Sequence, residues 1–89
     1  MRAVITVLGK DMVGILAGVS NICAETNVNI IEVTQSILQD MFAMIMLADI
    51  SKSTTDFTVL SDRLSEFGNS NGLSVHTMHE DIFNSMHRI

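Results

Sequence analysis

The feature of this sequence that most constrains its fold is the alternation of two hydrophobic periods along the chain. Apolar residues at helical spacing predict one helix from Ile15 to about Thr26 and another from Phe57 to Phe67. Short runs rich in β-branched and other apolar residues predict four strands, at residues 2–8, 28–38, 41–50 and 73–78. The predicted order is therefore strand, helix, strand, strand, helix, strand.

This order matches the split βαβ arrangement of ferredoxin-like domains. We expect an α+β two-layer sandwich: an antiparallel four-stranded sheet of order 4-1-3-2, two helices on one face, and a short C-terminal helix over 81–86. The 89 residues suffice for one core and not for two, and no linker divides them, so we predict a single domain over 1–89. Asp11 is the candidate N-cap of the first helix, and Gly68 the candidate glycine that ends the second.

The third predicted strand is apolar on both of its faces. Phe42, Met44 and Met46 point one way, and the intervening residues 43, 45 and 47 are apolar as well. A two-layer domain buries only one sheet face, so we expect something to cover the other. The candidates are a second subunit, which would make the protein a homodimer, and the terminal segment with its apolar residues Ile82, Phe83, Met86 and Ile89.

Composition argues against several classes of function. The chain has five scattered Lys and Arg against ten Asp and Glu, which gives a formal charge of −5, and it has no Trp or Tyr. This composition does not suit direct nucleic-acid binding. No stretch approaches the ~18 apolar residues of a membrane span. The first residues lack the architecture of a signal peptide, and the lone cysteine, Cys23, can form no intramolecular disulfide. We predict a reduced, cytoplasmic protein.

No side chains with catalytic spacing are found, so we predict a binding protein without cofactor rather than an enzyme. Cys23 falls on the apolar stripe of the first helix, which favours burial over nucleophilicity. His76 and His79, near the end of the fourth strand, are weak candidates for a metal site. Their odd separation points them to opposite faces of a strand, so they converge only if the strand ends between them. Solvated polar residues at a strand end are the more common interpretation.

The best candidate site is the loop from Gly9 to Ile15. A glycine-bearing loop that opens a helix presents unpaired backbone N–H groups and a partial positive charge, which suit a carboxylate. Asp11 would accept a bond from an ammonium group. Asn29, which we expect at the same end of the sheet, would add an amide. A purely structural interpretation also stands: such helix starts are common, and these residues would then only cap, pack or turn.

Several segments also resemble a known family. The run from Val4 to Val19, with Asp11 and Gly14-Ile15, resembles the opening of ACT domains, and Asn27 to Ile30 resembles the start of their second strand. ACT domains are small βαββαβ regulatory modules. The whole chain is similar to the free-standing UPF0237 proteins and to the ACT repeats of the glycine cleavage repressor, and we expect no fused enzyme or DNA-binding domain.

The resemblance implies an effector site at an interface between ACT domains, often for an amino acid. By position, it nominates Asp11, Met12, Val13, Gly14, Ile15, Asn29 and Ile30 as ligand-binding residues. Our leading hypothesis is a dimeric regulatory domain that senses a small metabolite and acts through assembly or a partner protein. Two alternatives remain: an adaptor module that binds no ligand, and a small metal-binding protein that uses the terminal histidines.

Overall fold

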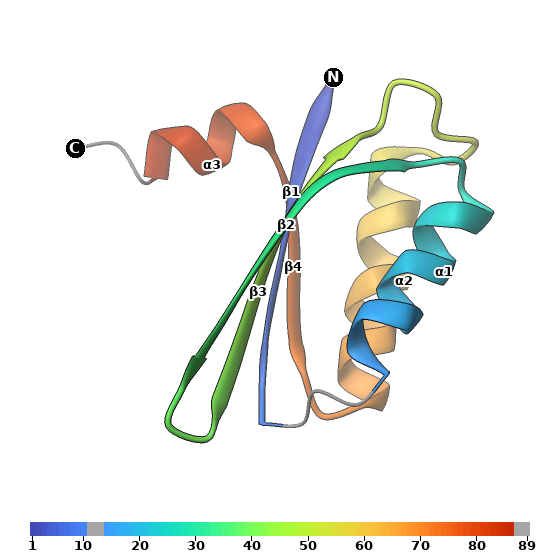
Figure 1. The fold of residues 1–89 in the computed structure, drawn as a ribbon. Helices are drawn as coiled ribbons and strands as arrows, with labels where there is room; N and C mark the ends of the chain where they lie inside the picture. Colours follow the sequence, from blue (N-terminus) through green and yellow to red (C-terminus); the bar gives the residue numbers. More distant parts are fainter. Residues whose placement is uncertain (11–13, 87–89) are drawn as a thin grey trace.

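The computed structural model describes residues 1–10 and 14–86 and shows two layers with a third, partial one (Figure 1). Helices α1 (Ile15–Glu25) and α2 (Phe57–Ser70) cover one face of the sheet, and the short α3 (Glu80–Met86) lies on the other. The strands are β1 (Arg2–Gly9), β2 (Asn29–Leu38), β3 (Met41–Asp49) and β4 (Ser74–His79). Their order, β2-β3-β1-β4, confirms the predicted 4-1-3-2 arrangement.

The register of the sheet defines its two ends. β3 runs antiparallel to both of its neighbours, and Asp49 lies opposite both Arg2 and Asn29. At the other end, Phe42 lies opposite Gly9 of β1. We call these the Asp49 end and the Phe42 end. A bulge between Ile30 and Glu32 interrupts the pairing of β2 near the Asp49 end.

The core lies between the sheet and the two long helices. The predicted stripe of α1 is buried there, as are Leu60 and Leu64 of α2, while Phe67 is partly buried against the same cluster. From β3, Phe42, Met44 and Met46 point into this core. The alternation of buried and exposed residues along β3 follows from the period of two in a strand.

Both long helices end in the same backbone motif. The N–H of Val28 donates to the carbonyl of Cys23 (2.8 Å), and that of Leu73 donates to the carbonyl of Gly68 (2.8 Å). These are Schellman bonds, and they require a left-handed residue just before, here Asn27 (φ 58°) and Gly72 (φ 69°). The prediction that Gly68 ends α2 was therefore wrong. Gly68 is buried inside the helix, where a Cβ would lie 2.6 Å from Val75 Cγ2.

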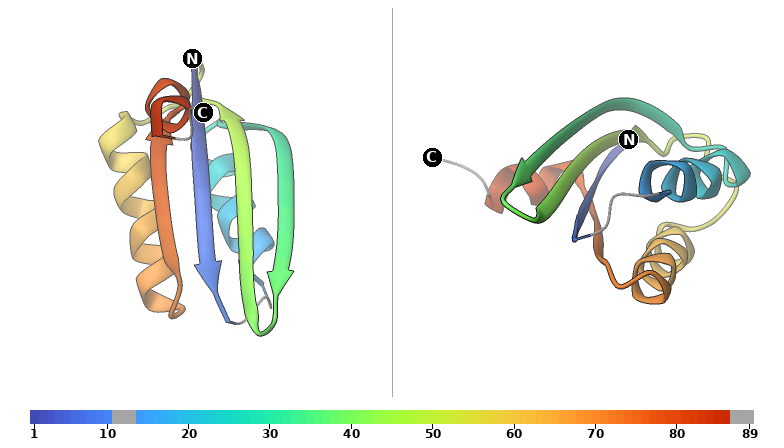
Figure 2. Two further views of the ribbon diagram at one scale, coloured as in Figure 1. Left: turned by 90° about the vertical axis from the view of Figure 1, so that its left-hand side faces the viewer. Right: turned by 60° about the horizontal axis from the view of Figure 1, so that its bottom comes forward.

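The sheet face away from α1 and α2, which we call the open face, is only partly covered. α3 contacts β1 and β4, and Val4 on this face is buried. Toward the Phe42 end, Leu8, Met41 and Ile45 remain exposed. The expectation that both faces of β3 are buried is thus wrong within one chain: the terminal segment covers only the Asp49 end (Figure 2, left). Of that segment, Ile89 lies outside the described residues.

Within the described residues, no helix is long and apolar enough to span a membrane.

Candidate functional site

The predicted ligand loop leads into α1 at the Phe42 end of the sheet. Gly14 is the N-cap of α1, with φ 75° and ψ 0°, and no side-chain hydrogen bond caps the helix. The first turn of α1 also contains no acidic residue. The helix N-terminus therefore keeps its partial positive charge without a side-chain counter-group among the described residues. The prediction of Asp11 as N-cap was wrong, and Asp11, Met12 and Val13 themselves lie outside the described residues.

Asn29 lies at the opposite end of the sheet, so the structure does not bring the predicted site together. Gly9 is level with Phe42, whereas Asn29 is level with Asp49, seven residues further along β3 and about 23 Å away at ~3.3 Å per residue. The expectation that they share one end was wrong because α1 reverses the chain direction. β2 therefore starts level with the start of β1, whatever the handedness of the connection.

Asn29 lines a small pocket at the Asp49 end, with a volume of about 200 Å³. Its polar neighbours there are Asn27, Asp49 and Lys52. The Asn27 side chain donates from Nδ2 to the Lys52 carbonyl (3.0 Å), which ties the end of α1 to the loop after β3. Ile30, the next predicted ligand residue, packs instead against the edge of the core.

Asp49 is a residue of this pocket that the sequence analysis did not nominate. Its Oδ1 accepts a hydrogen bond from the Ser51 N–H (2.9 Å). Hydrogen bonds from Ser51, helped by the N-terminal ammonium and Lys52, lower the pKa of the Asp49 carboxyl. The stabilisation from the charged form is present above the ordinary pKa and is lost as pH falls through the lowered pKa. The available signal was the hairpin register, which sets Asp49 opposite Asn29.

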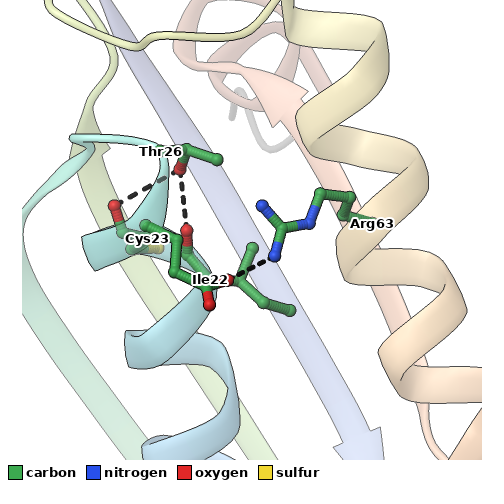
Figure 3. A network of polar contacts seen from close by, with 5 residues as sticks. Ile22, Cys23, Thr26 and Arg63 are labelled. Carbon is green, nitrogen blue, oxygen red and sulfur yellow. Dashed lines mark hydrogen bonds and ion pairs between the residues drawn. The ribbon is translucent and has the colours of Figure 1, made fainter.

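Thr26 fixes the end of α1 beside this pocket (Figure 3). The Thr26 hydroxyl is buried and hydrogen-bonds the carbonyls of Ile22 (2.8 Å) and Cys23 (3.3 Å). Arg63 of α2 forms an ion pair with Glu25 at the same helix end. The Thr26 hydrogen bonds satisfy carbonyl groups in the last turn of α1. They therefore fix the point at which the chain leaves the helix toward Asn27 and Asn29.

A second depression, of about 570 Å³, borders the predicted loop at the Phe42 end. Gly9 and Lys10 line it together with Leu8, Met41 and the turn from Gly72 to Ser74. A Cβ on Gly9 would lie 2.2 Å from Leu73 Cδ2, so glycine is needed for this close approach. The two halves of the predicted site therefore border two separate pockets at opposite ends of the molecule.

The histidines do not form a joint site. The His79 ring stacks on Phe57 of α2, with ring centroids 4.1 Å apart, whereas His76 lines the open face and its Nε2 lies 3.1 Å from Ser74 Oγ. The prediction that they point to opposite faces is confirmed, because β4 continues through both. The described residues contain no cluster of three metal-ligating side chains. Cys23 is buried, and burial raises the pKa of its thiol, as expected for a core residue.

Comparisons with known proteins agree with this architecture. The family model described as "ACT domain" matches residues 2–78. A UPF0237 protein of Clostridium perfringens is 56% identical over 89 residues, which is 100% of both chains. The solved ACT domain protein from Streptococcus pneumoniae has a TM-score of 0.80 and 37% identity, and the match covers 93% of each chain. A candidate glycine cleavage system transcriptional repressor has a TM-score of 0.73 and 26% identity, over 85% of this chain and 43% of that one.

Proposed function

This chain belongs to the ACT domain family and, within it, to the UPF0237 proteins, and we propose that it is a dimeric regulatory domain that binds a small metabolite such as an amino acid. ACT domains are regulatory rather than catalytic modules, in line with the lack of catalytic spacing in the sequence. The observation that carries the proposal is the pair of half-sites at the two ends of α1.

The half-sites have opposite electrostatic character. The N-terminus of α1 at Gly14 offers backbone amides that no side chain of the described residues caps, and it suits a carboxylate. The Asn29 pocket offers the Asp49 carboxylate and amide oxygens, which suit an ammonium group, while Lys52 at its edge offsets part of the negative charge. A free amino acid carries both charges only a few bonds apart, so one molecule cannot span the length of α1, which is about 16 Å for its 11 residues at ~1.5 Å per residue.

A second copy that pairs along β2 would join the half-sites. β2 is an edge strand of ten residues, and the only charged residue on it is Glu32. Ile31, Val33 and Ile37 on β2 are exposed. A long edge with exposed apolar residues and no lysine or proline is suited to pairing with another chain. Antiparallel pairing about a two-fold axis sets the Asp49 end of one copy beside the Phe42 end of the other. Because α1 contacts β2, Gly14 and Asn29 of different copies would then approach each other.

Thermal denaturation of the full chain against each of the twenty amino acids tests ligand binding. We expect at least one to raise the melting temperature, since a ligand at 100 times its dissociation constant adds about 2.7 kcal/mol of stability. Asn29→Ala should abolish the shift, and Asn69→Ala, at the exposed end of α2, should retain it. A wild-type protein that responds to none of the twenty at millimolar concentration would contradict amino-acid sensing.

Analytical ultracentrifugation tests the dimer separately. Wild type should sediment as a dimer at micromolar concentration. Val33→Lys should dissociate it because a lysine on an edge strand opposes strand pairing. Val59→Lys, on the exposed surface of α2, is the matched control and should remain dimeric. A monomeric wild type would overturn β2 pairing. A dimer that binds no ligand would instead favour the adaptor function.

A further inference from the structure

A third concave site lies on the open face, and it shares only Leu8 with the depression beside Gly9 and Lys10. α3 lies at one end of the open face (Figure 2, left). Residues of α3 and of strands β1, β3 and β4 line a groove of about 470 Å³. We call it the α3 groove. Its volume is within the range of small-molecule sites, about 300–1,000 Å³. Its apolar walls are formed by Leu8, Ala43, Ile45, Met78, Phe83 and Met86.

The charge of the groove restricts what it can hold. No Asp, Glu, Lys or Arg of the described residues lines it, although 17% of the chain is charged. A charged ligand would lose part of its hydration there without gaining a counter-charge, which is unfavourable. The methionine and phenylalanine side chains at its rim can adapt their packing to a guest of irregular shape. The groove thus favours an uncharged, apolar occupant.

Two polar side chains stand together within this apolar surface. Thr6 of β1 and His76 of β4 are paired across the sheet, and both line the groove. Thr6 offers a hydroxyl, and His76 offers Nδ1 of its imidazole because Nε2 is within hydrogen-bond distance of Ser74 Oγ, so the pair can donate or accept a hydrogen bond. A few placed polar groups in an apolar concavity are characteristic of sites that orient a small molecule.

We propose that the α3 groove binds a small uncharged molecule that is mainly apolar and carries one hydrogen-bonding group, held by Thr6 and His76. α3 rises above the sheet at one end of the groove, which leaves a slot rather than a flat surface. The sheet and α3 bound this site on two sides, and a second flat sheet laid over the open face would meet α3 first. The site is independent of the half-sites at Gly14 and Asn29.

Indole is a suitable probe because it is neutral, aromatic and carries one N–H donor. We expect titration of the ¹⁵N-labelled full chain with indole to shift the amide resonances of the groove residues in a saturable manner. Ala43→Phe, which fills the groove, should weaken this binding at least tenfold. Ala17→Phe, the same change at an exposed position of α1 across the sheet, should leave it unchanged. Should Ala43→Phe not fold, Ile45→Phe narrows the groove from an exposed position.

The hydrogen-bonding role is tested with indene, which has the shape of indole without the N–H. His76→Leu should weaken indole binding about three- to tenfold, as expected for one net hydrogen bond, and leave indene binding unchanged. The proposal would be overturned if His76→Leu weakened the binding of indole and indene equally. It would also be overturned if neither probe shifted the groove resonances in a saturable manner. A dimer that dissociates on Ala43→Phe while indole has no effect would overturn it as well, since the open face would then bind a second copy.

Discussion

At the scale of single residues, Gly18 illustrates how a glycine inside a helix is explained by its neighbour. A Cβ at this position would lie 2.2 Å from Cζ of Phe67 on α2. Glycine costs helix stability of nearly 1 kcal/mol relative to alanine, so the chain gives up local propensity to let the Phe67 ring approach α1.

Gly18→Ala should therefore lower the free energy of unfolding by about 1–2 kcal/mol, because overpacking outweighs the gain in helix propensity. Urea denaturation followed by circular dichroism measures this change. Phe67→Leu in the same chain removes the ring atoms that the new methyl group meets, so the double variant should lose less than the sum of the two single changes. A single variant as stable as wild type would show that the ring moves aside without cost.

At the scale of elements, α1 and α2 share a C-terminal motif but use different residues in it. The left-handed position is Asn27 after α1 and Gly72 after α2. Asparagine adopts this conformation more readily than other non-glycine residues, and Asn27 also donates to the Lys52 carbonyl. The same motif leads the chain from α2 into a short turn before β4. After α1 it leads the chain into the pocket that Asn29 lines.

Gly72→Ala should lower the free energy of unfolding by about 1–2 kcal/mol, the cost of a Cβ in the left-handed region. A methyl group at Gly72 would have no described atom within 4 Å, so the cost is conformational and not steric. Gly72→Asn should cost less, as the native Asn27 indicates. Chemical denaturation of both variants at one protein concentration makes the comparison. Equal losses for Ala and Asn would contradict this account.

At the scale of the whole molecule, α3 is the only described element on the open face, and few contacts hold it. An ion pair joins Arg2 of β1 to Glu80 (2.8 Å), with side chains that are 47% and 25% exposed. Val4 beneath this end of the sheet is 4% exposed. The family model ends at residue 78, just before α3 begins, so α3 lies outside the part of the chain that this model matches.

Removing residues 80–89 should leave the sheet and the long helices folded. It should also lower the free energy of unfolding by about 1.5–3 kcal/mol, the value of burying a valine-sized side chain. Arg2→Ala breaks only the ion pair and should cost less than about 1 kcal/mol, because exposed pairs contribute little. Urea denaturation at a fixed protein concentration distinguishes the two. A truncated chain as stable as the full one would mean that α3 does not shield Val4.

The sequence predicted the elements well because each depends on a local period. The stripe from Ile15 to Cys23 and the β-branched residues of β2 are sufficient for their elements to be identified. The site was predicted less well because it depends on which ends of the elements meet. Asn29 was assigned to the wrong end of the sheet, and Asp49 became visible as its neighbour only through the register of β2 with β3. Gly68 was misassigned because its packing against Val75 is a tertiary contact.

The separation of Gly14 and Asn29 along one chain has a thermodynamic consequence for the proposed sensor. A ligand that bridges two copies binds the dimer and not the monomer, so ligand affinity and subunit affinity are linked and each raises the other by the same factor. The apparent dissociation constant of the ligand would then rise as the protein is diluted. Symmetry would give each dimer two equivalent sites. The amount of liganded dimer would therefore depend both on the concentration of the metabolite and on the concentration of the protein itself.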